Sequence, residues 1–160
     1  MPKDYFNPPV AAATEQNHII SPQALMFERL VGDMQSALDE EVFFDDSDWP
    51  CGFDWGGEAE AVWQGLAEDA TMLATFQTRR PMERLLCRAA GVIHRAICAG
   101  SLDELDAARL KLVNIMDVSA ESRIHFMLEE AQNCLDQMAD RAAGDNQVPP
   151  AAGFGSAPEA

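Results

Sequence analysis

The sequence predicts an all-α protein, a compact antiparallel bundle of about five helices. Apolar residues recur at spacings of three and four residues through five segments, which is the pattern of helices that bury one face. No segment of four to eight residues alternates cleanly between apolar and polar, so the chain offers no candidate strand. Short turn signals separate the last three segments, and short connections make neighbouring helices antiparallel.

The first helix is predicted over residues 21–42. Ser21 and Pro22 form a strong helix start, because the serine oxygen can accept a hydrogen bond from an orphan amide and proline at the first helical position loses no hydrogen bond. The apolar stripe expected to face the core consists of Leu25, Phe27, Leu30, Val31, Met34, Leu38 and Val42.

The second helix is predicted over residues 58–79, where helical spacing returns. Its expected buried residues are Val62, Trp63, Leu66, Ala70, Leu73 and Phe76. Arg80 precedes Pro81, and a residue before proline is pushed away from helical angles. Either a break or a kink is therefore expected near position 80.

The third helix is predicted over residues 81–99, and Gly100 is expected to end it, because glycine tolerates a positive φ. Its buried residues are predicted to be Leu85, Leu86, Ala89, Ile93, Ala96 and Ile97. Ser101 and Glu104 then fit a capping box, in which Ser101 accepts from the amide of Glu104 and the Glu104 carboxylate reaches back to the amide of Ser101.

That capping box opens a fourth helix over residues 102–117, and a turn near Val118 and Ser119 leads into a fifth over 120–143. The fourth is expected to bury Leu105, Ala108, Leu112, Ile115 and Met116. The fifth is expected to bury Ile124, Met127, Leu128, Ala131, Leu135 and Met138, with Gly144 closing it. One domain over residues 21–144 results, flanked by segments 1–20 and 145–160, whose composition predicts disorder.

The formal charge of −16 excludes several classes of partner. It opposes binding to nucleic acid or to anionic lipid and favours a basic protein surface. Residues 1–78 hold fifteen Asp and Glu against two bases, whereas residues 79–144 are nearly balanced, so the excess lies in the first half. No leader and no membrane span is expected, and four widely spaced cysteines suggest reduced thiols in the cytoplasm.

The densest acidic segment is "FFDDSDWPCGFDWGG", from Phe43 to Gly57. Its large aromatics either fold back to cap the end of the bundle or, flanked by carboxylates, form a patch that docks a basic partner. The docking hypothesis assigns partner binding to this segment and the acids before it: Asp39, Glu40, Glu41, Asp45, Asp46, Asp48, Trp49, Phe53, Asp54 and Trp55. A calcium loop fails here, because Pro50 and Cys51 stand where an oxygen ligand and a glycine are needed.

Arg80, Arg84, Arg88 and Arg95 fall on one side of the third predicted helix. This arginine ridge either pairs with acids of the first half, forms a solvated face, or binds phosphate or an acidic partner.

The chain shows no pattern that predicts catalysis, a metal or a cofactor. His94 and Cys98 have the spacing that a metal can bridge, and Cys87, His125 and Cys134 could complete a zinc site, but no CxxC or HxxxH motif supports one. The leading hypothesis is therefore a non-enzymatic, cytoplasmic interaction protein that binds a basic protein, in its most concrete form a nucleic-acid mimic that inhibits a DNA- or RNA-binding protein, as a phage anti-defence protein does. The alternative is a bundle that self-associates, for example as a homodimer, in a structural or adaptor role; a metal-binding or redox bundle ranks third.

Overall fold

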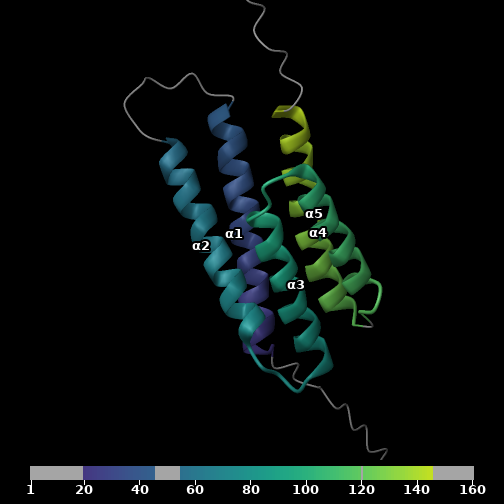
Figure 1. Ribbon diagram of the computed structural model, residues 1–160. Helices are drawn as coiled ribbons and strands as arrows, with labels where there is room; N and C mark the ends of the chain where they lie inside the picture. The colour runs from purple at the N-terminus through teal and green to yellow at the C-terminus, as the bar shows by residue number, and fades with distance from the viewer. Residues whose placement is uncertain (1–19, 46–54, 120, 146–160) are drawn as a thin grey trace, which may run out of the picture.

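A computed structural model of the chain describes residues 20–45, 55–119 and 121–145. Within these ranges the chain forms five helices and no strand, so the predicted all-α bundle is confirmed (Figure 1). The helices are α1 (Pro22–Asp45), α2 (Trp55–Thr75), α3 (Pro81–Ile97), α4 (Leu102–Met116) and α5 (Ser122–Asp145). The disorder expected of the two ends concerns residues that lie, apart from Ile20 and Asp145, outside the described ranges.

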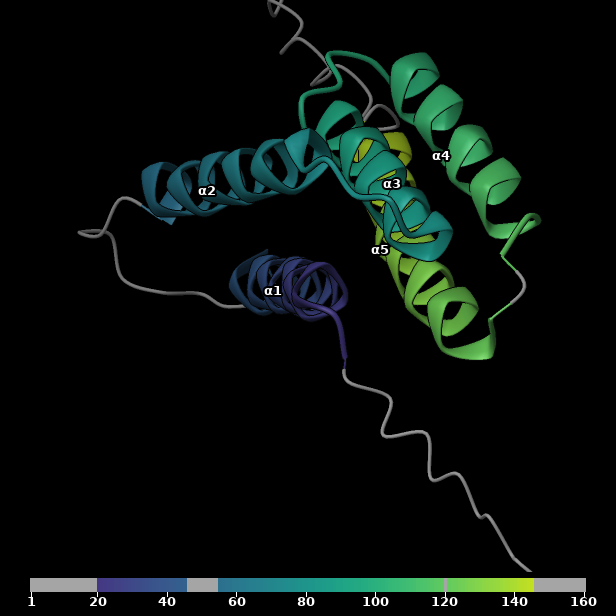
Figure 2. The same cartoon turned by 90° about the horizontal axis from the view of Figure 1, so that it is seen from below.

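The helices alternate in direction, and α3 lies in the middle. It packs against each of the other four, whereas α2 packs only on α1 and α3, and α4 only on α3 and α5, among the residues described. Figure 2 shows α2 and α4 on opposite sides of α3. The C-terminal ends of α1 and α5 and the N-terminal end of α2 lie together at the top of Figure 1.

Side-chain caps start α1 and α4 as the sequence predicts. The Ser21 hydroxyl accepts from the Ala24 amide at 3.2 Å, and the Ser101 hydroxyl accepts from the Glu104 amide at 3.3 Å. The second half of the predicted capping box is wrong in one detail. The Glu104 carboxylate accepts from the amide of Gly100, at 2.8 Å, instead of that of Ser101.

The break near position 80 is real, and α2 ends four residues earlier than predicted. The chain leaves the helix after Thr75, and Arg80 takes an extended conformation before Pro81, with φ −78° and ψ 127°. Glu83 fastens this linker to α3. Its buried carboxylate accepts from the Thr78 hydroxyl and lies 3.5 Å from Nη1 of Arg80.

Glycine does not end α3 or α5, so the two predictions that place a helix end at a glycine are wrong. No described glycine has a positive φ; α3 ends at Ile97, and α5 continues through Gly144 to Asp145. In α3 the amide of Cys98 still bonds to the carbonyl of His94, and the chain then turns into the Ser101 cap.

The core follows the predicted stripes with four exceptions. Phe27, Leu86, Ile93, Leu112 and Leu135 are fully buried, as predicted. Leu25 is 51% exposed, because nine residues place it about half a turn around the helix from Met34. Phe76 is exposed because it lies beyond the end of α2. Val42 and Val62 are exposed in the region where α1 ends and α2 begins.

Replacing Leu112 by Ala should lower the free energy of unfolding by roughly 2–5 kcal/mol, because the side chain is fully buried and leaves a cavity. Leu110 is the matched control on the same helix. It is 64% exposed, and Leu110→Ala should change stability by no more than about 0.5 kcal/mol. Chemical denaturation of both variants checks this, and equal losses would contradict the burial of α4.

Cys134 gives the fold a dependence on alkaline pH. The thiol is buried between α5 and α1, 3.6 Å from Oε1 of Gln35, and burial, with Glu130 and Asp39 nearby, raises its pKa from 9.0 to about 11. Between these pH values the unfolded chain has lost a proton that the folded chain keeps, so stability should fall as pH rises from 9 to 11, by about 2 kcal/mol.

Denaturation at several pH values, compared with Cys134→Ala, measures this contribution, because the remaining groups titrate in both proteins. The wild type should lose more stability than the variant over this range. If the unfolding free energies of the two proteins change in parallel with pH, the buried thiol does not cause the loss of stability.

Candidate functional site

The acidic end of the bundle contains a groove between the end of α1 and the start of α2. Its volume is about 380 Å³, and we call it the acidic groove. Its lining consists of Ala37, Glu40, Glu41 and Phe44 from α1 and Glu58, Ala59, Val62 and Trp63 from α2. Three carboxylates and three large apolar side chains therefore share one concave site.

Glu41 holds the groove together. Its carboxylate accepts a hydrogen bond from the indole N–H of Trp63 in α2 and lies 3.4 Å from Nη2 of Arg141 in α5. One side chain thus joins three helices and fixes the half-buried Trp63 ring as one wall. Glu41 is proposed from the sequence as a partner-binding residue; the structure gives its carboxylate these internal contacts.

Glu40 and Glu58 differ from Glu41 although they line the same groove. Both are exposed, and neither makes a hydrogen bond or an ion pair with any residue that the structure describes. Glu58 lies in the first turn of α2, where the helix dipole favours a negative charge. These two carboxylates are therefore available to an incoming cation.

The C-terminal end of α1 carries several acidic side chains, although a helix favours negative charge least at its C-terminus. Asp39, Glu40, Glu41 and Asp45 fall in its last seven residues, and its last turn has no basic residue. A helix C-terminus has a partial negative charge, and neighbouring carboxylates repel one another, so this cluster does not stabilise the helix. Helix stability does not explain why acids are concentrated here.

Exposed apolar side chains lie next to the groove, at the end of α1. Phe43 and Val42 are 57% and 51% exposed, and the Phe43 ring packs edge-on against Phe44, with 5.5 Å between the ring centroids. Aromatic and aliphatic surface beside unpaired carboxylates can pack against the methylene stems of Lys or Arg while the carboxylates bind the charged ends.

The ten residues predicted to bind a partner are only partly described. Asp39 is exposed on α1 and accepts from Gln35 at 2.9 Å. Asp45 is the last residue of α1 and Trp55 the first of α2, described for the backbone alone. Asp46, Asp48, Trp49, Phe53 and Asp54 lie outside the described residues, so the capping and docking interpretations of their segment both stay predictions.

The sequence does not identify the α2 half of the groove. Glu58 and Val62 are absent from the predicted site, and Trp63 is interpreted only as a core residue. Their helical spacing gave no sign that α1 leaves this side of α2 partly uncovered. The sequence does offer one indication of the groove: the clusters "DEEVFF" and "GGEAEAVW" lie at two helix ends that are expected to be adjacent.

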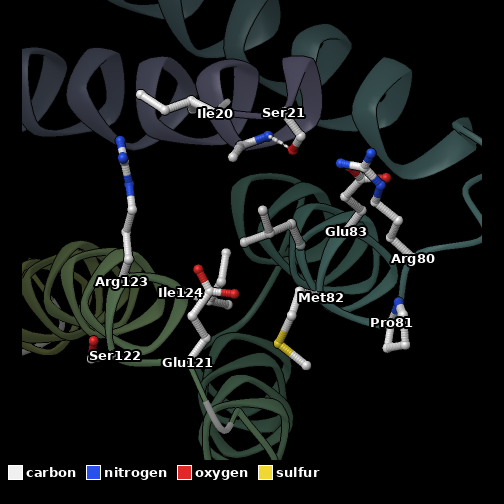
Figure 3. A pocket seen from close by; sticks show the side chains of 12 residues that line it. Ile20, Ser21, Arg80, Pro81, Met82, Glu83, Glu121, Ser122, Arg123 and Ile124 are labelled. Atoms are coloured by element: carbon white, nitrogen blue, oxygen red, sulfur yellow. Dashed lines mark hydrogen bonds and ion pairs between the residues drawn. The ribbon is translucent and has the colours of Figure 1, made fainter. Parts of the chain in front are cut away.

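A second cavity, of about 470 Å³, lies at the opposite end, where α1, α3 and α5 begin (Figure 3). Three of its four charged lining residues have partners within the fold: Arg80 lies beside Glu83, and Arg123 pairs with Glu28 at 3.2 Å. The fourth, Glu121, makes no ion pair with a described residue, and His125, one turn further along, contacts the Ser119 hydroxyl at 3.0 Å. Two arginines and two glutamates line the cavity, so its formal charge is balanced and favours neither a cation nor an anion.

The candidate zinc ligands do not come together. Among the described residues no three His, Cys, Asp or Glu side chains form a group that could hold a metal. His94 and Cys98 are neighbours, with 3.6 Å between Nε2 and Sγ, while Cys134 is buried against α1. Burial, reinforced by Glu83, raises the pKa of the Cys87 thiol and so disfavours the thiolate that a metal would need.

Comparisons with protein-family models, with curated proteins and with solved structures find no match to this chain. Within its described ranges, no helix combines the length and the apolar character needed to cross a bilayer.

Two adjacent acids should differ in their effect on stability. Glu41→Ala removes the acceptor of the Trp63 N–H and should cost roughly 1–2 kcal/mol of unfolding free energy. Glu40→Ala removes an exposed carboxylate and should change stability by no more than about 0.5 kcal/mol. Thermal and chemical denaturation of the two variants compares them directly, and an effect of Glu40→Ala as large as that of Glu41→Ala would refute the division of roles.

Proposed function

We propose that the chain is an acidic interaction protein that binds a basic protein surface through the acidic groove. One observation carries the proposal: Glu40 and Glu58 have no described partner and stand at a concave, partly apolar site. A Lys or Arg side chain of the partner enters the groove, lays its stem against Phe44 and Trp63, and ends between the two carboxylates. The predicted partner-binding residues between 45 and 55 connect, in the sequence, the two helices that line the groove.

The proposed partner is a DNA- or RNA-binding protein. The chain inhibits this protein by mimicking its nucleic acid. Spaced carboxylates can occupy a groove that normally binds phosphates, and the charge of −16 steers the chain toward such a surface. The proposal assigns no catalytic step to the chain. A cytoplasmic location is proposed as well, because Cys87, Cys98 and Cys134 are free thiols.

The charged residues should control association with the partner more than folding. A partner recovered by co-purification, then produced pure, is mixed with wild type, with Glu40→Lys/Glu58→Lys, and with the loop variant Asp45→Asn/Asp46→Asn/Asp48→Asn. The first variant should weaken affinity by at least about tenfold, because like charges then face each other. The second should slow association, and the wild-type on-rate should fall steeply as salt rises.

Glu129→Lys, on the exposed surface of α5 and outside the groove, is the matched control and should bind like wild type. Displacement of a labelled oligonucleotide from the same partner tests mimicry. The interaction proposal is wrong if both groove and loop variants bind as tightly and as quickly as wild type at low salt. Partner binding that leaves the oligonucleotide in place would refute mimicry alone.

A further inference from the structure

Five of the eleven Lys and Arg residues of this acidic protein lie on α3 or directly before it. Residues 79–97 contain five arginines against one glutamate, in a chain whose net charge is −16. Arg84, Arg88 and Arg95 lie within about 40° of one another around α3, at 100° per residue. The arginine ridge on α3 therefore consists of these three exposed residues, while Arg80 of the predicted ridge precedes the helix and lies beside Glu83.

Most other arginines of the described chain form ion pairs, and the ridge arginines, like Arg79 and Lys111, do not. Arg29 pairs with Asp33, Arg109 with Asp106 and Asp136, Arg123 with Glu28, and Arg141 with Glu41. The three ridge arginines make no ion pair with any described residue, although the chain has more than twice as many acids as bases. Pairing with acids of the first half is thus found for Arg123 and Arg141, and not for the ridge.

The same chain carries a surface that complements the ridge. In the acidic groove, Glu40 and Glu58 also lack described partners, and Phe44 and Trp63 line the same groove. Guanidinium groups bind carboxylates in a bidentate manner and stack on aromatic rings, so an Arg-bearing helix suits this groove. Arg84 and Arg88 lie one turn apart on α3, with Cβ atoms about 6 Å from each other, so two guanidinium groups leave the same side of the helix.

We propose that the arginine ridge binds the acidic groove of a second copy of this chain. Within one copy the two surfaces belong to different helices and make no ion pair, so both are open to neighbours. Because the surfaces differ, the contact is heterologous, and each copy keeps one surface of each kind for a further copy. The net charge of every copy opposes the contact, so its strength depends on close pairing and not on long-range attraction.

The inference does not depend on the proposed function, because it requires no other protein. It does predict competition, since a basic partner and a second copy would occupy the same groove.

Two charge-reversal variants test the contact. The ridge variant is Arg84→Glu/Arg88→Glu, the groove variant is Glu40→Lys/Glu58→Lys, and Arg29→Glu/Arg123→Glu is the control that changes charge equally outside the ridge. Circular dichroism and thermal melting first establish that each is folded. Sedimentation velocity at increasing protein concentration, at low and at high salt, then measures association.

Wild type and control should self-associate at low salt and dissociate at high salt. The ridge and groove variants should each associate at least about tenfold more weakly, and an equimolar mixture of the two should restore association, because each supplies the surface that the other has reversed. Restoration by mixing cannot come from a general change in stability or net charge.

Monomeric wild type at every concentration and salt would overturn the proposal. So would a ridge variant that associates like wild type, or a mixture that fails to restore association. A wild-type monomer that binds a single-stranded oligonucleotide through Arg84 and Arg88 would instead assign the ridge to nucleic acid. None of these outcomes bears on partner binding by the groove, which is measured with a different protein.

Discussion

The burial of α3 is the constraint on which the rest of the structure depends. Four helices cover it, and its small residues allow them to approach closely: a Cβ added at Gly91 would lie 3.6 Å from that of Ala74 in α2. A helix covered on so many sides has only a narrow exposed strip. Charged residues cannot be buried without partners, so the arginines of α3 must fall on that strip. The arginine ridge therefore follows from the central position of α3, whatever it binds.

Opposite charges are separated in this bundle by geometry as well as by sequence. Antiparallel helices bring the acidic end of α1 beside the first turn of α2, which concentrates carboxylates that are far apart in the chain. Consecutive residues of a helix point in directions about 100° apart, so Glu40 and Glu41 face different surroundings and have different roles. Glu41 faces Trp63 and Arg141 and stabilises the packing, while Glu40 remains exposed. Charge alone does not distinguish them.

Most of the fold could be predicted from the sequence, because helical spacing and side-chain caps are local. Ser21, Ser101 and Pro81 act within a few residues and were interpreted correctly. Leu25 differs, because its hydrophobic character predicts burial whereas its angle around the helix places it outside the core. The acidic groove could be predicted only in part. Its α1 acids were visible as a cluster, but Trp63 joins them through a contact between residues 22 positions apart, which no local pattern reveals.

The two proposals place one groove in competition between two basic surfaces. A second copy brings three ridge arginines on a molecule of net charge −16, whereas a protein that binds nucleic acid brings a basic surface on a molecule that the chain attracts. Coulomb attraction over distances near the screening length therefore favours the partner, and only short-range contacts favour the second copy. Self-association should consequently be the weaker of the two interactions. A weak contact of this kind would cover the half-buried aromatics of the groove until a more basic partner displaces it.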